Sequence, residues 1–260
     1  MSLKGRSALI TGATGELGKV FSDTLAELGA DLILVDRPGT ELDKLCIELK
    51  NRWGIESNYL QCDLLLTDQR DELIKRINRD FIQLNILVNN AAFVGSSELK
   101  GWAVPFENQS IESWGSAIEL NLTAVFDLCK GITPKLKISN GSSIINIASI
   151  YGLYGPDWRL YEDTNMSNPA AYGVSKGGLI QLTRWLSTTV APNIRVNSIS
   201  PGGIIRNQPK HFIERYESRT PLKRMAVEDD FRGALAYLAT DLSGYVTGQN
   251  IIVDGGWGVW

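Results

Sequence analysis

Short apolar runs alternate with longer amphipathic segments along the chain. The runs are rich in Ile, Leu and Val without regular polar alternation, which is typical of strands buried on both faces of a sheet. We expect seven strands, at 7–11, 32–35, 59–61, 86–89, 143–147, 194–199 and 251–253. Helix-length segments lie between them, at 16–28, 41–53, 68–79, 111–136, 168–190 and 227–239. This alternation predicts an α/β fold, with a doubly wound parallel sheet covered by helices on both faces.

Two segments interrupt this alternation, at 152–167 and 202–224. Each follows a predicted strand, and ligands of open α/β sheets bind beyond the carboxyl ends of the strands. We therefore interpret both segments as substrate loops. Because the chain shows no repeat, low-complexity stretch or linker, we expect a single domain over 1–260.

Composition excludes some classes of partner. The net charge is −3, and 26 basic and 29 acidic residues are scattered along the chain, so no nucleic-acid partner is expected. Cys46, Cys62 and Cys129 have neither a metal-ligand spacing nor a disulfide pattern, which favours a reducing, cytoplasmic location and no metal. The chain begins without a signal-peptide pattern, and no apolar run is of bilayer length, so no membrane association is expected.

A glycine-rich turn follows the first predicted strand and opens the first predicted helix. Residues 11–18 read Thr-Gly-Ala-Thr-Gly-Glu-Leu-Gly. Glycines in this position let the backbone approach a pyrophosphate, which the free N–H groups of the helix N-terminus attract. The turn predicts a dinucleotide site of the Rossmann type. The candidate contacts are Gly12, Thr14, Gly15, Leu17 and Gly18.

An acidic residue at the end of the second strand bears on the choice of cofactor. Asp36 could accept hydrogen bonds from an adenosine ribose and would repel a 2′-phosphate, which favours NAD. Arg37 could instead pair with that phosphate, but the glycine turn has no basic residue before Lys19. NAD is therefore expected, and NADP is the alternative.

Four polar residues indicate proton-transfer chemistry. Tyr172 and Lys176 are four apart in a predicted helix, so they share a face, and an ammonium near the phenol would lower the pKa of Tyr172. Ser149, just past the fifth strand, could donate to a substrate oxygen, while Asn121 could hold a water that links Lys176 to solvent. The single histidine, His211, supports neither a Ser-His-acid triad nor a histidine-rich metal site.

Taken together, these residues resemble the short-chain dehydrogenase/reductase family over nearly the whole chain. The resemblance also covers Pro201-Gly202 and the ending Thr247-Gly248-Gln249 through Val253-Asp254-Gly255-Gly256. It implies a Rossmann fold, a nicotinamide cofactor, a small-molecule substrate, a homo-oligomer (tetramer or dimer), and a catalytic tetrad of Asn121, Ser149, Tyr172 and Lys176. Tyr172 and Lys176 would also contact the cofactor. The further cofactor contacts that it implies are Asp63 (to the adenine amino group), Leu64, Asn90, Ala91, Pro201, Gly202 and Ile204.

Three departures from the family pattern affect the cofactor turn and the substrate end. Glu16 replaces a usual glycine, and the glycines at 12, 15 and 18 are spaced as in the extended branch that handles sugar nucleotides. Ser149 and Tyr172 are 23 residues apart, and the extra residues carry Trp158 and Arg159. Arg206 stands where threonine is usual, and its planar fork suits a carboxylate or phosphate. We therefore expect Trp158, Arg159 and Arg206 to bind substrate.

A narrower resemblance is to the bacterial flagellin-modification protein A group, which is associated with surface-glycan and nonulosonic acid pathways. It is carried by Ile145–Gly152, by Pro-Asp-Trp-Arg-Leu-Tyr-Glu at 156–162 and by Asp-Gly-Gly-Trp at 254–257. We expect an NAD(P)-dependent oxidoreductase acting on an alcohol or ketone, and the narrower resemblance implies a substrate derived from a sugar. The alternatives are a sugar-nucleotide epimerase or dehydratase that recycles bound NAD, and a non-catalytic NAD-binding module.

Overall fold

A computed structural model describes residues 1–260 and confirms the predicted Rossmann fold. All strands join one parallel sheet in the order β3-β2-β1-β4-β5-β6-β7. The strands are β1 Ser7–Thr11, β2 Asp31–Asp36, β3 Ser57–Gln61, β4 Ile86–Asn89, β5 Ser142–Ile147, β6 Ile194–Pro201 and β7 Asn250–Val253. The α-helices are α1 Glu16–Glu27, α2 Leu42–Trp53, α3 Thr67–Asp80, α4 Ile111–Ile118, α5 Ala124–Lys137, α6 Ala170–Thr189, α7 Lys210–Arg219 and α8 Arg232–Ala239.

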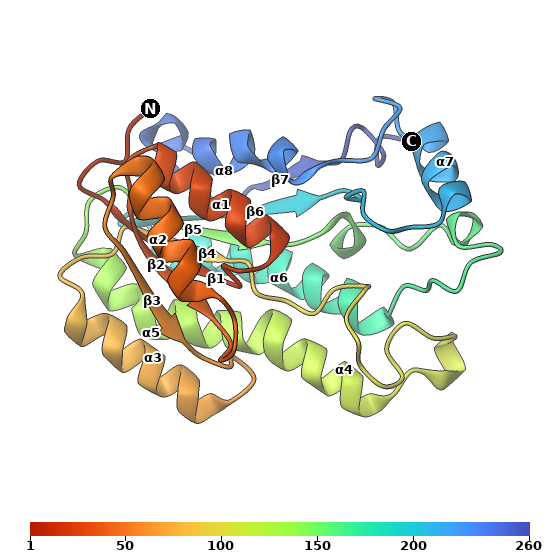
Figure 1. Cartoon of the computed structure of the whole chain (residues 1–260), viewed down its shortest axis with the longest axis horizontal. Helices are drawn as coiled ribbons and strands as arrows, with labels where there is room; N and C mark the ends of the chain where they lie inside the picture. Colours follow the sequence, from red (N-terminus) through yellow and green to blue (C-terminus); the bar gives the residue numbers. More distant parts are fainter.

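Helices cover both faces of the sheet, as Figure 1 shows. Successive side chains of a strand point to opposite faces, so Ala8 and Ile10 pack with α1, α2 and α8, whereas Leu9 packs with α3, α5 and α6. Because both faces are buried, β1, β2 and β4 are almost wholly apolar. The equally buried β5 and β6 also carry polar residues such as Ser143, Asn146 and Asn197, whose side chains are hydrogen-bonded.

Two helical features differ from the sequence-based expectation. The segment predicted as one helix over 111–136 contains a π-helical stretch, η2 Glu119–Thr123, between α4 and α5. Within the predicted substrate loop 202–224, residues Lys210–Arg219 form α7, which buries Phe212 and Tyr216 on one face. The short helices are η1 Phe106–Asn108, η3 Ile150–Gly152, η4 Trp158–Leu160, η5 Glu228–Phe231 and η6 Asp241–Ser243.

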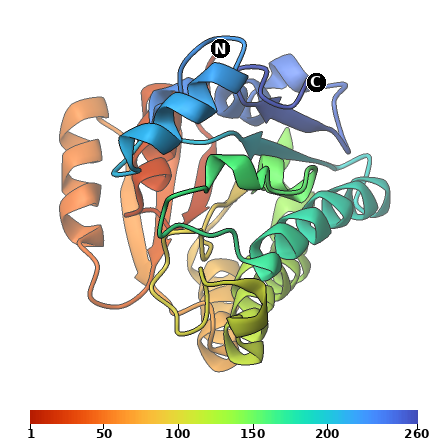
Figure 2. The ribbon, with the colours of Figure 1, turned by 90° about the vertical axis from the view of Figure 1, so that its right-hand side faces the viewer.

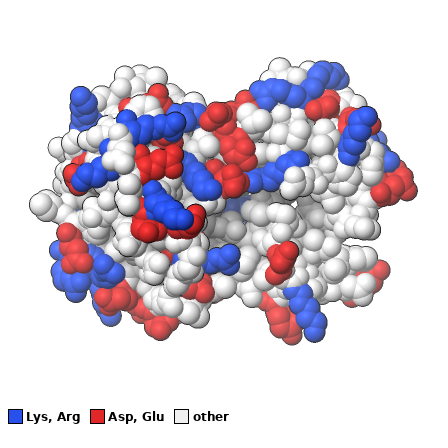
Figure 3. All heavy atoms as spheres, in the orientation of Figure 1, with Lys and Arg blue, Asp and Glu red and all other residues white.

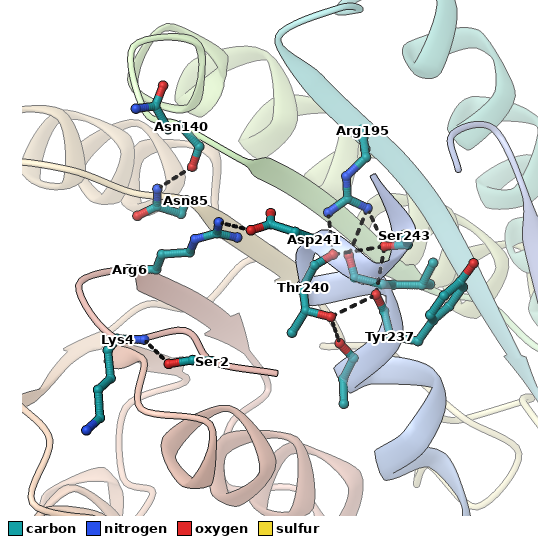
Figure 4. Close-up of polar contacts among 12 residues, drawn as sticks. Ser2, Lys4, Arg6, Asn85, Asn140, Arg195, Tyr237, Thr240, Asp241 and Ser243 are labelled. Atoms are coloured by element: carbon teal, nitrogen blue, oxygen red, sulfur yellow. Dashed lines mark hydrogen bonds and ion pairs between the residues drawn. The ribbon is translucent and has the colours of Figure 1, made fainter. Parts of the chain in front are cut away.

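A polar network closes the amino ends of the strands (Figure 4). Arg6 pairs with Asp241 at 2.6 Å, and Arg195 donates to the Ser243 hydroxyl at 2.7 Å and to the Leu238 carbonyl at 3.0 Å. These contacts tie the end of α8 and η6 to the sheet. The opposite, carboxyl ends of the strands are left for the long connections.

Figure 2 looks onto those carboxyl ends, which are surrounded by the segment that follows β4, the 152–167 loop and α7. Acidic and basic side chains are interspersed over the face shown in Figure 3, which is hollowed near its middle. No helix of the chain combines the length and the apolar character needed to cross a membrane.

Candidate active site

The strand order reverses between β1 and β4, and the predicted glycine turn lies at this point. Gly12 has a φ of +63°, and a Cβ there would come within 2.8 Å of Ala91 Cα. Asn90, which follows β4, donates from Nδ2 to the carbonyls of Thr11 and Gly12, each at 3.0 Å. The crevice at such a reversal is where open α/β sheets bind ligands. Asn90 thus braces the turn through its side chain.

The packing of α1 against this turn requires the last glycine. A Cβ on Gly18 would lie 2.0 Å from the Gly12 carbonyl oxygen, so only glycine allows the approach. Gly15 is the N-cap of α1 and has no side chain to bond the first N–H groups of the helix. Those groups have no partner within the helix, so the N-terminus can accept an anion. Thr14 and Leu17 flank this N-terminus.

Asp36 ends β2 beside the glycine turn. Its Oδ2 accepts from the backbone N–H of Thr14 at 2.9 Å and from the Thr14 hydroxyl at 2.7 Å. Arg37 is exposed, and its backbone N–H donates to the other carboxylate oxygen at 2.8 Å. The carboxylate therefore lies at the edge of the crevice, while the side chain of Arg37 is free to move.

The loop after β3 lies on the same edge of the sheet. Asp63 accepts from the N–H of Leu65 at 3.0 Å and donates its own N–H to Gln69 Oε1 at 2.7 Å. Leu64 is buried. The structure therefore gives Asp63 a turn-forming contact, which is compatible with a second role toward adenine.

Asn121 lies in the π-helical stretch η2, fully buried. Its Oδ1 accepts from the N–H of Phe93 at 2.8 Å, and its Nδ2 donates to the Phe93 carbonyl at 3.1 Å and to Ser175 Oγ at 3.1 Å. Both polar atoms of the side chain are therefore engaged. Asn121 fixes the segment after β4 and contacts α6 between Tyr172 and Lys176. Irregular π turns of this kind are frequent at functional sites.

Ser149, Tyr172 and Lys176 come together beyond the carboxyl end of β5. Ser149 is the N-cap of η3, where its hydroxyl oxygen accepts from the Tyr151 N–H at 3.2 Å, and its side chain lies close enough to Tyr172 to lower the pKa of the phenol. Lys176 is 3% exposed and donates from Nζ to the Ile147 carbonyl at 2.7 Å. The same Nζ lies 5.9 Å from the centroid of the Tyr172 ring. The i, i+4 spacing thus places both side chains on one face of α6.

Burial dominates the electrostatics of this pair. It lowers the pKa of Lys176 to about 7, because no carboxylate offsets the cost of removing the ammonium from water. Burial also raises the pKa of Tyr172, although the nearby Ser149 hydroxyl opposes this effect. The structure does not show the expected lowering of the Tyr172 pKa by Lys176, because Lys176 Nζ donates to the Ile147 carbonyl and lies 5.9 Å from the centroid of the Tyr172 ring.

The segment after β6 supplies the last predicted contacts. Pro201 pairs with Val253 of β7, and a Cβ on Gly202 would come within 2.8 Å of Asp254 Cα. Ile204 forms an isolated bridge with Ala226. Arg206 forms an ion pair with Glu228 at 2.9 Å and remains 42% exposed.

The 152–167 loop packs on α7 and on the C-terminal segment through rings that sequence reasoning did not connect. We call these rings the aromatic cluster: Tyr151, Tyr154, Trp158, Tyr161, Phe212, Tyr216 and Trp257. Trp158 stays 55% exposed, and Arg159 forms a two-pronged ion pair with Asp157, at 2.8 and 2.7 Å. Arg219 of α7 lies 4.1 Å above the ring of Trp257 and also pairs with Asp157. The recurrence of aromatic residues in three separate segments was the available sequence signal.

The residues at the strand ends fit a nicotinamide dinucleotide. The uncapped helix α1 suits a pyrophosphate, Asp36 suits ribose hydroxyls, and the cradle at Gly12 and Gly18 leaves no room for a Cβ. Such a cofactor supplies a hydride acceptor or donor when bound. The Ser149 and Tyr172 hydroxyls supply groups able to bind an oxygen and to move its proton. This combination of fold and site defines a nicotinamide-dependent oxidoreductase.

Comparison with known proteins identifies the family. Residues 12–258 match the family model described as enoyl-(acyl carrier protein) reductase. A tropinone reductase homolog of Arabidopsis thaliana is 35% identical, covering 99% of this chain and 94% of the relative. The post-translational flagellin modification protein A of Campylobacter coli is 30% identical, covering 99% and 100%. The chain belongs to the short-chain dehydrogenase/reductase family.

Solved structures agree with this assignment. A xylitol dehydrogenase with bound NAD⁺ superimposes with a TM-score of 0.86 at 27% identity, covering 98% of this chain and 100% of that one. An NADPH-dependent 3-quinuclidinone reductase from Rhodotorula rubra gives 0.85 at 25% identity, covering 100% and 93%. The two neighbours differ in cofactor, so the family alone does not decide between NAD and NADP.

Proposed function

We propose that this oxidoreductase interconverts the alcohol and ketone forms of a polyhydroxylated, sugar-like compound. In this reaction Tyr172 is the group that transfers the proton. The observation that carries the proposal is the juxtaposition of the Ser149 and Tyr172 side chains beside the buried Lys176, whose Nζ lies 5.9 Å from the centroid of the Tyr172 ring. Ser149 would bind the substrate oxygen, and Tyr172 would donate or accept the proton at that oxygen. Lys176 would hold the nicotinamide ribose, and Asn121 would fix the surrounding backbone.

NAD is the proposed cofactor. Asp36 presents its carboxylate at the crevice, where it can accept from ribose hydroxyls, while a 2′-phosphate there would meet a like charge. The predicted contacts to the rest of the cofactor are Gly12, Thr14, Gly15, Leu17, Gly18, Asp63, Leu64, Asn90, Ala91, Pro201, Gly202 and Ile204.

The proposal of a sugar-like substrate rests on the names of similar proteins and on three side chains. A probable galactose dehydrogenase of Rhizobium meliloti is 31% identical over 98% of this chain, and a flagellin modification protein and a xylitol dehydrogenase are similar to it. Trp158 offers an exposed stacking face. Arg159 and Arg206 offer planar guanidinium groups, which now pair with carboxylates. Each would exchange that carboxylate for an anionic or hydroxyl group of the substrate. A surface-glycan or nonulosonic acid pathway is the proposed setting, in the cytoplasm.

Net turnover with free cofactor tests this proposal. Wild type is incubated with NAD or NADP and a panel of sugars, polyols and sugar acids, and formation of the reduced cofactor is followed by absorbance.

Tyr172→Phe should lower kcat by a factor on the order of 10² or more while the Kd for NAD stays nearly unchanged. Undiminished turnover in this variant would exclude Tyr172 as the proton carrier. Product formation without net reduction of free cofactor would favour an epimerase or dehydratase that recycles NAD.

A further inference from the structure

Arg70 is a buried charged residue that lies outside the candidate active site. It lies in the first turns of α3 and is 2% exposed. All three guanidinium nitrogens have partners. Nη1 donates to the Leu64 carbonyl at 2.6 Å, and Nη2 donates to the Thr67 hydroxyl at 3.0 Å. An arginine stays charged even when buried, so it holds such partners firmly.

The same guanidinium also contacts the helix that carries Asn121. Nη2 pairs with Glu119 at 2.7 Å, and Nε pairs with Asp127 at 3.1 Å. Glu119 is the first residue of the π-helical stretch, and Asp127 lies in the first turn of α5. Arg70 therefore connects the loop after β3 to the start of the π-helical stretch and to the first turn of α5.

Hydrogen bonds continue from there to the proton-transfer pair. Asn121, in the same π-helical stretch, donates to Ser175 Oγ at 3.1 Å. Ser175 Oγ in turn donates to the backbone carbonyl of Tyr172 at 2.9 Å. The path from the Leu64 carbonyl thus runs through Arg70 to Glu119, along the backbone of the π-helical stretch to Asn121, and through Ser175 to the backbone of Tyr172. Paths of packed and hydrogen-bonded groups are a physical means by which two sites can be coupled.

We propose that Arg70 is a positioning residue that couples binding of the adenine half of the cofactor to the ordering of the π-helical stretch, and hence of Asn121 and Tyr172. The inference rests on the proposed function, in which the loop at Asp63 and Leu64 binds adenine. Adenine binding would fix the Leu64 carbonyl, and Arg70 transmits this constraint to Glu119. Asn121 and Tyr172 are then held in place before hydride transfer takes place.

Hydrogen exchange with ADP as the probe tests the coupling without a substrate. ADP carries the adenine and pyrophosphate but no nicotinamide, so any effect at the π-helical stretch must come from the adenine half. In wild type, saturating ADP should slow amide exchange over 119–124 by a factor on the order of 5, the lower end of measured allosteric couplings. In Arg70→Met, ADP should still bind, and exchange over 119–124 should not respond to it.

Two further variants distinguish the proposed coupling from a general loss of structure around Arg70. Arg79→Met, an exposed position on the same helix, should keep the full ADP response. Glu119→Gln leaves the contacts of Arg70 to Leu64 and Asp127 and should weaken the response even if Arg70→Met fails to fold. An equal ADP response in wild type and Glu119→Gln, or no response in wild type with bound ADP, would overturn the coupling. Failure of ADP to raise the melting temperature of wild type would instead overturn the proposed adenine site on which the inference depends.

Discussion

At the scale of single residues, the pKa of Lys176 gives the protein a specific dependence on pH. The folded protein releases this proton from about pH 7, whereas the unfolded chain keeps it to near 10.5. Between these values the unfolded state binds more protons, so the free energy of unfolding gains at most about 1.4 kcal/mol per pH unit from Lys176 as pH rises. The difference in stability between wild type and Lys176→Met, from urea melts at pH 7 to 10, should rise with pH. A flat difference would mean that Lys176 is solvated.

We predict that the negative charge of Asp36 sets the preference for NAD over NADP. Asp36→Asn keeps an oxygen that can accept from Thr14, so the glycine turn is preserved, but it removes the repulsion of a 2′-phosphate. The ratio of the Kd for NADP to that for NAD should fall by roughly tenfold, corresponding to about 1.4 kcal/mol. Fluorescence titrations with both reduced cofactors measure this ratio. An unchanged ratio, or tighter NADP binding already in wild type, would assign control to Arg37.

At the scale of elements, the 152–167 loop separates into an exposed part and a packed part. Trp158→Ala removes a half-exposed ring and should raise KM while leaving stability nearly unchanged. The neighbouring Leu160, 3% exposed, packs beneath the loop, so Leu160→Ala should cost about 2–5 kcal/mol of stability. Thermal melts and KM measurements on both variants test this division. Equal KM values for Trp158→Ala and wild type would show that the loop is structural only.

Strands β1, β2 and β4 were predictable because burial on both faces leaves a nearly unbroken apolar run that few other structures share. The π-helical stretch at Asn121 was not, because a shift in backbone hydrogen bonding leaves the spacing of apolar residues almost unchanged. Helix α7 was not predicted because most of its residues are charged or polar, although Phe212 and Tyr216 show an i, i+4 spacing. The ion pair of Arg206 with Glu228 joins residues 22 positions apart and depends on tertiary packing that the sequence does not reveal.

For the whole molecule, we expect a homo-oligomer, either a tetramer or a dimer. Helices α4, α5 and α6 lie on one side of the sheet and leave Trp114, Phe126 and Trp185 39%, 43% and 55% exposed. Large aromatic side chains left exposed on a set of neighbouring helices favour a protein contact. Light scattering during gel filtration should give two or four times the chain mass of 28.7 kDa. A single-chain mass at micromolar concentration would contradict this expectation.

The one histidine of the chain, His211, lies in α7 and contacts the Asp163 carbonyl of the 152–167 loop through Nε2 at 3.1 Å. Its imidazole is therefore a natural spectroscopic reporter for the contact between α7 and the 152–167 loop. Nitrogen-15 labelling of histidine would give a single pair of ring resonances from the native protein, without any engineered probe. Their chemical shifts would change when a ligand separates or tightens the loops. Ligands could thus be ranked by loop movement before any turnover is detectable.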